Sequence, residues 1–284
     1  MKSNMELFFP LDVPPQIRPF VRRILYIKSA EHIDTVISPG PTGYQYFIWV
    51  VRGELIQEKG GNEVYGQGSL FLAGQIKDHP IDIRYTGKLV ILLLEFSALG
   101  CFELFGILGT IALNKAPKVA SLGEEHAEFE QMLINDSSSI GADDIHLRLA
   151  LICSLLEKRI EKIHALPRYL YSAIQEIESK HGAIKLSDLT KSIGVSRRQF
   201  ARKFRQVVGV SPKYFCRVLQ MNKAIEALAM NEESVISDIA NNAGYFDESH
   251  LIHAVQDFFG FSAAQLVDLQ HPAVTKVHAS SRKT

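Results

Sequence analysis

Residues 187–209 constrain the fold more than any other stretch, because they predict two short helices joined by a tight turn. Gly194 stands where such a turn needs a residue that accepts a left-handed backbone, and Ser196 is placed to cap the helix that follows. From residue 197 onward, the side chains separate into an apolar stripe and a cationic face. The apolar stripe is Phe200, Phe204, Val207 and Val208, and the cations are Arg197, Arg198, Arg202, Lys203 and Arg205. This division predicts a helix that packs on one side and reads the major groove of DNA with the other.

The distribution of charge along the chain also favours a polyanionic partner. The 31 basic and 31 acidic residues cancel overall, but residues 167–230 hold 12 basic and 4 acidic residues. Residues 231–270 hold 7 acidic residues and no Lys or Arg, and residues 1–166 hold 16 basic and 20 acidic residues. Asymmetry between neighbouring segments indicates a charged partner. The five cations of the second helix lie among no acids, so as a merely solvated face they would repel one another without compensation.

Membrane, metal and disulfide classes find little support in the sequence. No apolar run approaches the ~18 residues that span a bilayer, and the first residues lack the apolar segment of a signal peptide, so we expect a cytoplasmic protein. Cys101, Cys153 and Cys216 are far apart and form no C-x-x-C pair, so we expect buried thiols rather than a disulfide framework or zinc site. An alkyl transferase fused to the same type of DNA-binding domain needs a reactive cysteine. Cys216 lies near cations but in an apolar helix, so we expect no enzyme, no catalytic residue, no metal and no cofactor.

The chain is long enough for two domains with separate cores, and the fold class we predict is α+β. Residues 1–112 predict a β-rich barrel or jelly roll, with a central strand at 44–51, a turn at Arg52-Gly53 and strands at 81–86 and 88–96. Residues 113–166 predict helices that complete a sensor and dimerisation domain over 1–166. The helix expected at 142–163 has apolar residues on more than one stripe, which makes it a candidate homodimer seam. The alternative is that all of this face packs within one subunit.

A small barrel can hold one ligand, and some side chains of the first domain suit an organic anion. These candidates are the aromatic residues Tyr44, Tyr46 and Trp49, the cation Arg84, and His79 in a turn-like setting. Packing within the core is the alternative role for each aromatic residue. A metal site in the barrel is disfavoured, because no H-x-H pair occurs.

The second domain, residues 167–270, is predicted to be all-α and to contain the helix-turn-helix pattern twice. The first unit spans 184–209 and the second 234–260, and a long helix over 213–230 joins them. Gly244 matches Gly194 and Gly260 matches Gly209. Two such units would set their reading helices one DNA turn apart, about 34 Å. Residues 271–284 are expected to form a flexible tail.

Residues 167–267 resemble the two-part DNA-binding domain of the AraC/XylS family of bacterial transcription regulators. Two motifs carry the resemblance: L-x-x-x-I-G-V-S-R-R-Q-F-x-R-x-F-R from Leu189, and I-S-D-I-A-x-x-x-G-Y-x-D-x-S-H-L from Ile236. The resemblance implies binding to double-stranded promoter DNA, often as a dimer and often as an activator that acts with RNA polymerase. It also implies a small molecule or partner sensed through the N-terminal domain.

The resemblance further implies base contacts from the positions of Arg198, Ala201 and Arg202. Because Ala201 cannot make a bidentate contact, Arg198 and Arg202 are the preferred base readers. Arg197, Lys203, Arg205 and Lys213 are assigned to phosphates, and Gln199 is a further candidate.

The second unit departs from the family pattern, because it has His253, Val255 and Gln256 where a basic residue, an aromatic residue and a lysine are usual. Its candidate DNA contacts are Glu248, Ser249, His250, His253 and Gln256. We expect this unit to add little electrostatic affinity. The alternative is an interaction protein whose acidic second unit binds a protein partner.

Overall fold

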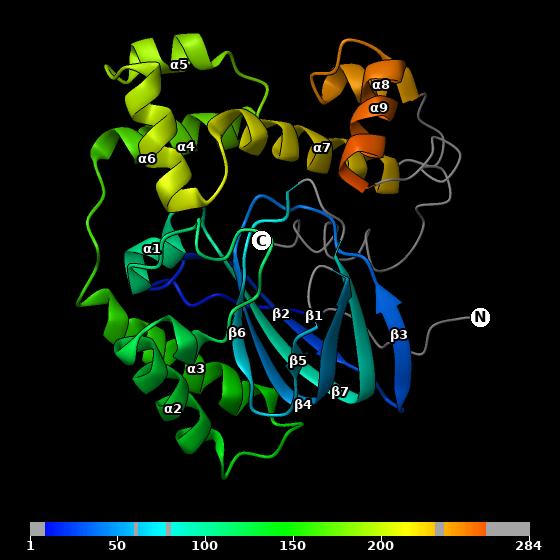
Figure 1. Ribbon diagram of the computed structural model, residues 1–284, viewed down its shortest axis with the longest axis vertical. Helices are drawn as coiled ribbons and strands as arrows, with labels where there is room; N and C mark the ends of the chain where they lie inside the picture. Colours follow the sequence, from blue (N-terminus) through cyan, green and yellow to red (C-terminus); the bar gives the residue numbers. More distant parts are fainter. Residues whose placement is uncertain (1–8, 60–61, 78–80, 231–235, 260–284) are drawn as a thin grey trace.

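The computed structural model describes residues 9–59, 62–77, 81–230 and 236–259, which form a sheet domain and a helical domain (Figure 1). Seven strands form the sheet: β1 (Phe9–Leu11), β2 (Val21–Lys28), β3 (Ile33–Ile37), β4 (Tyr46–Lys59), β5 (Val64–Tyr65), β6 (Leu70–Ala73) and β7 (Asp82–Phe96). Helices α1 (Gly100–Phe105), α2 (Glu124–Ser137) and α3 (Ile145–Ile160) complete the first domain, with a short 3-10 helix at Val119–Leu122. The second domain holds α4 (Arg168–Ser179), α5 (Leu186–Ser192), α6 (Arg197–Val208), α7 (Pro212–Met230), α8 (Ile236–Asn242) and α9 (Glu248–Phe259).

The sheet is antiparallel throughout and is built on the two long strands β4 and β7, which pair with each other along most of their length. The strand order is β1-β2-β7-β4-β5, while β3 pairs with β7 and β6 pairs with β4. Gly53 (φ 89°) and Gly87 (φ 98°) lie side by side in the two strands, where the register of their pairing shifts. The turn predicted at Arg52-Gly53 is therefore wrong, because β4 runs from Tyr46 to Lys59 through the left-handed Gly53 without ending there. The predicted strands 81–86 and 88–96 likewise form the single strand β7.

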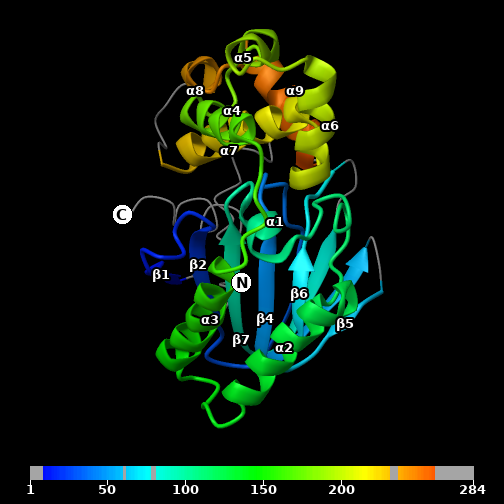
Figure 2. The same cartoon turned by 90° about the vertical axis from the view of Figure 1, so that its left-hand side faces the viewer.

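The side chains of β4 alternate between two cores on opposite faces of the sheet. Phe47 and Trp49 belong to the core that α1, α2 and α3 cover, and in Figure 2 α2 and α3 lie across this face. Ile48 and Val50 belong to a second core on the other face. The ring of Phe47 lies 4.8 Å from that of Phe105, so this strand and α1 are fixed to each other at the centre of the first core. The sheet thus has one helix-covered face and one face left to enclose a cavity.

The helix predicted at 142–163 is α3, and it contributes Ile152, Leu155 and Leu156 to the helix-covered core. Part of its apolar face therefore packs within the subunit. Leu147, near its start, leaves 54% of its surface exposed. The dimer seam stays a prediction.

The helical domain has two cores that meet along α7, which runs between the two helix-turn-helix units (Figure 1). One core holds α4, α5, α6 and the first half of α7, and it also takes in Tyr44, Ala98 and Leu99 of the sheet domain. The other core joins α8 and α9 to the second half of α7. The predicted fold class, a β-rich domain followed by an all-α domain with two helix-turn-helix units on a long helix, is confirmed. Gly260 and the tail 271–284 lie outside the described residues.

Candidate nucleic-acid interface

The first helix-turn-helix unit is α5, a tight turn and α6. Gly194 has the left-handed backbone (φ 68°) that the sequence predicts. The Ser196 hydroxyl accepts a hydrogen bond from the Gln199 amide at 3.2 Å and caps α6. The Val195 amide donates to the Thr190 carbonyl across the turn. These bonds fix the angle at which α6 leaves the turn.

Helix α6 buries one face completely and exposes the other. Phe200 and Phe204 are fully buried, and the Phe204 ring lies 5.5 Å from the rings of Phe200 and Phe215. On the opposite side, Arg198, Arg202 and Arg205 are exposed and follow one another at helical spacings of four and three residues. We call these three residues the arginine stripe. Because all three side chains are exposed, their guanidinium groups are accessible to an anionic surface.

The second unit repeats this backbone geometry closely. Gly244 is again left-handed (φ 83°), and the Asp247 carboxylate accepts from the His250 amide at 2.8 Å, as Ser196 accepts from Gln199. The Tyr245 amide donates to the Ala240 carbonyl across the turn. Helices α8 and α9 have 7 and 12 residues, the same lengths as α5 and α6.

The outward face of α9 carries different chemistry. Counted from the capping residue, Ser249, His253 and Gln256 occupy the positions of Arg198, Arg202 and Arg205, and all three are exposed. The turn is also one residue longer, since three steps rather than two separate its glycine from its cap. The additional residue is Phe246, which leaves 87% of its surface exposed.

Most predicted contact residues lie on the exposed surface, with one departure. Lys203 is half-buried, and its ammonium lies 5.6 Å from the centre of the Phe102 ring on α1 and 3.3 Å from the Gln206 side-chain oxygen. It therefore faces the sheet domain, because its position on α6 lies to one side of the arginine stripe. The remaining candidates are exposed: Arg197, Gln199, Ala201, Lys213, Glu248 and His250, together with the residues of the two stripes.

A buried ionic network ties α4 of the helical domain to the sheet domain. Glu95 on β7 accepts hydrogen bonds from Arg22, Arg23 and, at 2.6 Å, the Tyr46 hydroxyl. Burial opposes the charge of Glu95, but Arg23 and Arg22 outweigh it and lower the pKa of this carboxyl. The network continues into α4 through two residues. The Arg22 guanidinium lies 3.7 Å above the Tyr44 ring, and the Tyr44 hydroxyl donates to Glu178 at 2.9 Å.

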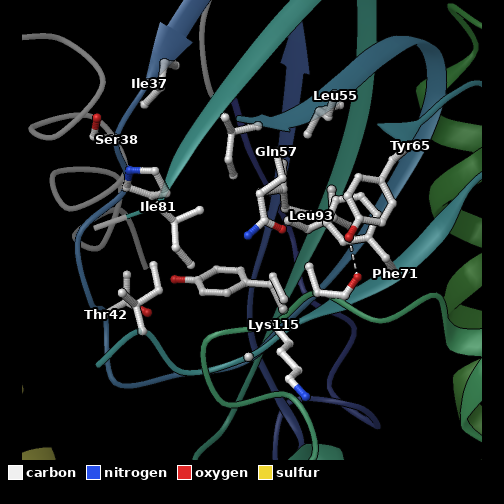
Figure 3. A pocket seen from close by; sticks show the side chains of 18 of the residues that line it. Ile37, Ser38, Thr42, Leu55, Gln57, Tyr65, Phe71, Ile81, Leu93 and Lys115 are labelled. Atoms are coloured by element: carbon white, nitrogen blue, oxygen red, sulfur yellow. Dashed lines mark hydrogen bonds between the residues drawn. The ribbon is translucent and has the colours of Figure 1, made fainter. Parts of the chain in front are cut away.

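The uncovered face of the sheet encloses a cavity of about 150 Å³ (Figure 3). Its lining is mostly apolar, and Tyr44 and Tyr46 from the predicted ligand set are part of it. Further lining residues, among them Tyr65, Tyr85 and Gln57, do not belong to the predicted ligand set, and no local pattern signals them. The register shifts within β4 change which residues face the cavity, so Gln57 lies there although Ile48 and Val50 fix the opposite parity earlier in the strand. Tyr65 donates its hydroxyl to the Ala116 carbonyl at 2.5 Å.

Two members of the predicted ligand set lie elsewhere, and a third is not described. Trp49 is buried in the core on the opposite face, because strand alternation turns it away from the cavity side, and the Arg148 guanidinium lies 5.1 Å from its ring. Arg84 is at the surface in ion pairs with Asp34 and Glu58. His79 lies outside the described residues. The expectation that Trp49 and Arg84 line a pocket with the tyrosines is therefore corrected.

The three thiols are all buried. Burial raises the pKa of Cys216 to about 12 and that of Cys153 to about 11, and it raises that of Cys101 as well, which disfavours the thiolate. Within the described ranges, no group of three or more His, Cys, Asp or Glu side chains could hold a metal ion. Over the same ranges, no helix is long and apolar enough to cross a bilayer.

Three comparisons place the chain among known proteins. A family model described as a helix-turn-helix domain, of the AraC type, matches residues 189–268. No curated protein sequence matches the chain. Among solved structures, ToxT from Vibrio cholerae O395 is 12% identical with a TM-score of 0.45, covering 87% of this chain and 97% of its own.

Two further solved structures are similar to the chain. ToxT bound to (E)-4-(8-methylnaphthalen-1-yl)but-3-enoic acid is 11% identical with a TM-score of 0.45, over 87% of this chain and 98% of its own. The AraC-like transcriptional activator CuxR is 13% identical with a TM-score of 0.27, over 74% of this chain and 92% of its own. The assignment therefore rests on the matched domain. Residues 189–268 are an AraC-type helix-turn-helix domain.

Proposed function

We propose that this chain is a transcription regulator of the AraC family and that it binds double-stranded promoter DNA chiefly through α6. The observation that carries the proposal is the arginine stripe, which stands exposed on a helix whose opposite face is buried. Arg198 and Arg202 read base edges in the major groove, where arginine makes bidentate contacts to guanine. Arg205, together with Arg197 and Lys213, contacts phosphates and sets the position of the helix on the duplex.

The second unit contacts the same DNA more weakly. Its outward residues Ser249, His253 and Gln256 are exposed and hold hydrogen-bonding groups, but none of them is Lys or Arg. Counterion release on binding scales with the number of phosphates that cations neutralise. The acidic Glu248 at the start of α9 adds repulsion from phosphates. We therefore assign most of the affinity to the first unit.

The sheet domain senses a small and largely apolar molecule in its cavity. The cavity supports this assignment by its apolar lining, to which Gln57 and several tyrosines add polar groups that can fix the orientation of a ligand. Figure 3 shows the Gln57 side chain among the cavity-lining groups. Tyr44 lines the cavity and also bonds Glu178 on α4, so occupancy of the cavity is relayed to the DNA-binding domain.

The regulator acts in the cytoplasm as a homodimeric activator with RNA polymerase as its partner, and it has no catalytic step. The exposed Leu147 near the start of α3 supports pairing through the helix over residues 142–163. Covering an apolar side chain at the surface of a long helix with a second copy of the chain removes it from water, which stabilises the dimer.

The proposal is tested by selecting duplexes from a random pool with the full-length chain and measuring their affinity by fluorescence anisotropy. The variant in which Arg198, Arg202 and Arg205 are all changed to Ala is expected to lose binding to the selected duplex. Lys158→Ala, which removes an exposed cation from α3, serves as the matched control and keeps wild-type affinity. Failure of the wild-type chain to enrich any duplex, or full affinity in the triple variant, contradicts the proposal.

A further inference from the structure

The C-terminal end of α6 rests directly on the sheet domain. The Gly109 amide, in the loop after α1, donates to the carbonyl oxygens of Gln206 and Val207 at 3.1 Å each. These carbonyls belong to the last turn of α6, where the carbonyl oxygens have no amide donors within the helix. The Gly209 amide closes the same turn by donating to Arg205 at 2.9 Å. A residue about 100 positions away thus completes the end of the principal reading helix.

The contact is so close that only glycine fits on either side. A Cβ on Gly109 would lie 2.4 Å from the Gly209 nitrogen and 2.5 Å from the Val207 oxygen. A Cβ on Gly209 would lie 2.6 Å from the Gly109 oxygen. These neighbours are backbone atoms, which cannot swing aside as the end of a flexible side chain can. Gly109 itself lies outside the left-handed region, so its need for glycine comes from this contact alone.

Gly109 is one of several sheet-domain residues that contact the end of α6 and the start of α7. We call the group Gln75, Ile76 and Gly109 the interdomain seat. The Cγ atom of Gln75 lies close to the end of α6, 3.4 Å from where a Cβ on Gly209 would be. The Tyr214 hydroxyl on α7 donates a hydrogen bond to the Ile76 carbonyl at 2.9 Å. Gly74 and Ile76, on either side of Gln75, line the cavity. The seat therefore shares its backbone with the cavity wall.

We propose that Gly109 is a positioning residue for DNA reading, which sets the direction of α6 and so of the arginine stripe. The docked arrangement supports the helix without masking it, because Arg198, Arg202 and Arg205 all stay exposed while the sheet domain holds the opposite end and flank. The inference rests on the proposed function. It adds that base reading by the first unit depends on a residue of the sheet domain.

Affinities of the full-length chain for two duplexes test the proposal: one selected by the wild-type chain from a random pool, and one of scrambled sequence. Gly109→Ala is expected to lose about tenfold on the selected duplex, the equivalent of one bidentate base contact, and nothing on the scrambled one. Amide exchange over residues 206–210 is expected to speed up in the free protein. Gly141→Ala, where a Cβ meets nothing within 4 Å, is the matched control and is expected to change neither the duplex affinities nor the amide exchange rates.

Several outcomes would overturn the proposal. A proportional loss on both duplexes shows general destabilisation, because only the active fraction has then changed. Unchanged affinity with faster exchange shows a contact with no role in reading, and tighter binding shows a masking contact. If Gly109→Ala does not fold, Tyr214→Phe, which removes the hydroxyl that donates to Ile76, is expected to lose about twofold on the selected duplex only. No loss in this second variant also overturns the proposal, whereas a wild-type chain that selects no duplex overturns the proposed function instead.

Discussion

The two helix-turn-helix units share a backbone and differ in the surface they present. Each has a left-handed glycine in the turn, an oxygen-bearing cap three residues before the amide it accepts from, and a second helix of 12 residues. On that common scaffold, one unit exposes three arginines and the other exposes Ser249, His253 and Gln256. A few positions specify the geometry, so the outward face is free to diverge. Similarity of fold between the units therefore does not make them equal in DNA affinity.

They also differ in what they pack against. The core of the first unit continues into the sheet domain through Tyr44, Ala98 and Leu99, and Gly109 completes the end of α6. The core of the second unit is formed by α7, α8 and α9. Among the described residues, the unit with the exposed arginines is thus in direct contact with the proposed sensor.

The largest expected effect comes from truncating one buried side chain in each of the two cores of the helical domain. Phe204 is fully buried between Phe200 and Phe215, so Phe204→Ala is expected to lower the free energy of unfolding by about 3–5 kcal/mol. The fully buried Leu251 makes the matched substitution in the second unit, and Leu251→Ala is expected to cost about 2–5 kcal/mol. Urea unfolding gives the two energies.

Amide exchange by segment then tells the cores apart. Phe204→Ala is expected to loosen the first unit and its contact with the sheet domain, whereas Leu251→Ala loosens α8 and α9. Loss of protection spread evenly over both units by either variant would contradict the separation of the cores.

A smaller effect is expected from removing one base reader. Arg198→Ala is expected to weaken binding to the selected duplex by about 1–3 kcal/mol and to relax the preference at one base position, because a bidentate contact is lost. Repeating the duplex selection with the variant measures the preference. Ser249→Ala, the equivalent position in α9, is the control, and an equal relaxation there would break the contrast between the units.

The smallest effect is a gain in the second unit. His253→Arg places a guanidinium at the position of Arg202, so it is expected to steepen the dependence of log K on log salt by about 0.9 if one more phosphate is neutralised. Titrations of one duplex at several salt concentrations give the slope. An unchanged slope would mean that this face of α9 does not approach the duplex.

The helix-turn-helix units are predictable from sequence because their determinants are local. A glycine, a cap and an apolar stripe within 23 residues predict α5 and α6, and the extra turn residue Phe246 is visible in the spacing from Gly244 to Asp247. The same local features, found again about 50 residues later, predict the second unit and show that α9 lacks Lys and Arg.

The cavity and the interdomain seat depend on pairings far apart in the chain, and no local signal carries them. Gly53 between polar residues has the pattern of a turn, but pairing of β4 with β7 on both sides of it keeps one strand continuous. Strand alternation shows that Tyr46 and Trp49 point to opposite faces, but not which face helices will cover. Gly109 and Gly209 meet only because the helical domain docks on the loop after α1.

The central claim, that one scaffold carries a strong and a weak DNA contact, is tested most directly by two substitutions at equivalent positions. Arg202→Ala and His253→Ala are compared in the full-length chain on the selected duplex, in the same buffer. Arg202→Ala is predicted to cost about 1–3 kcal/mol of binding free energy, and His253→Ala close to none. Equal losses from the two substitutions would contradict the account.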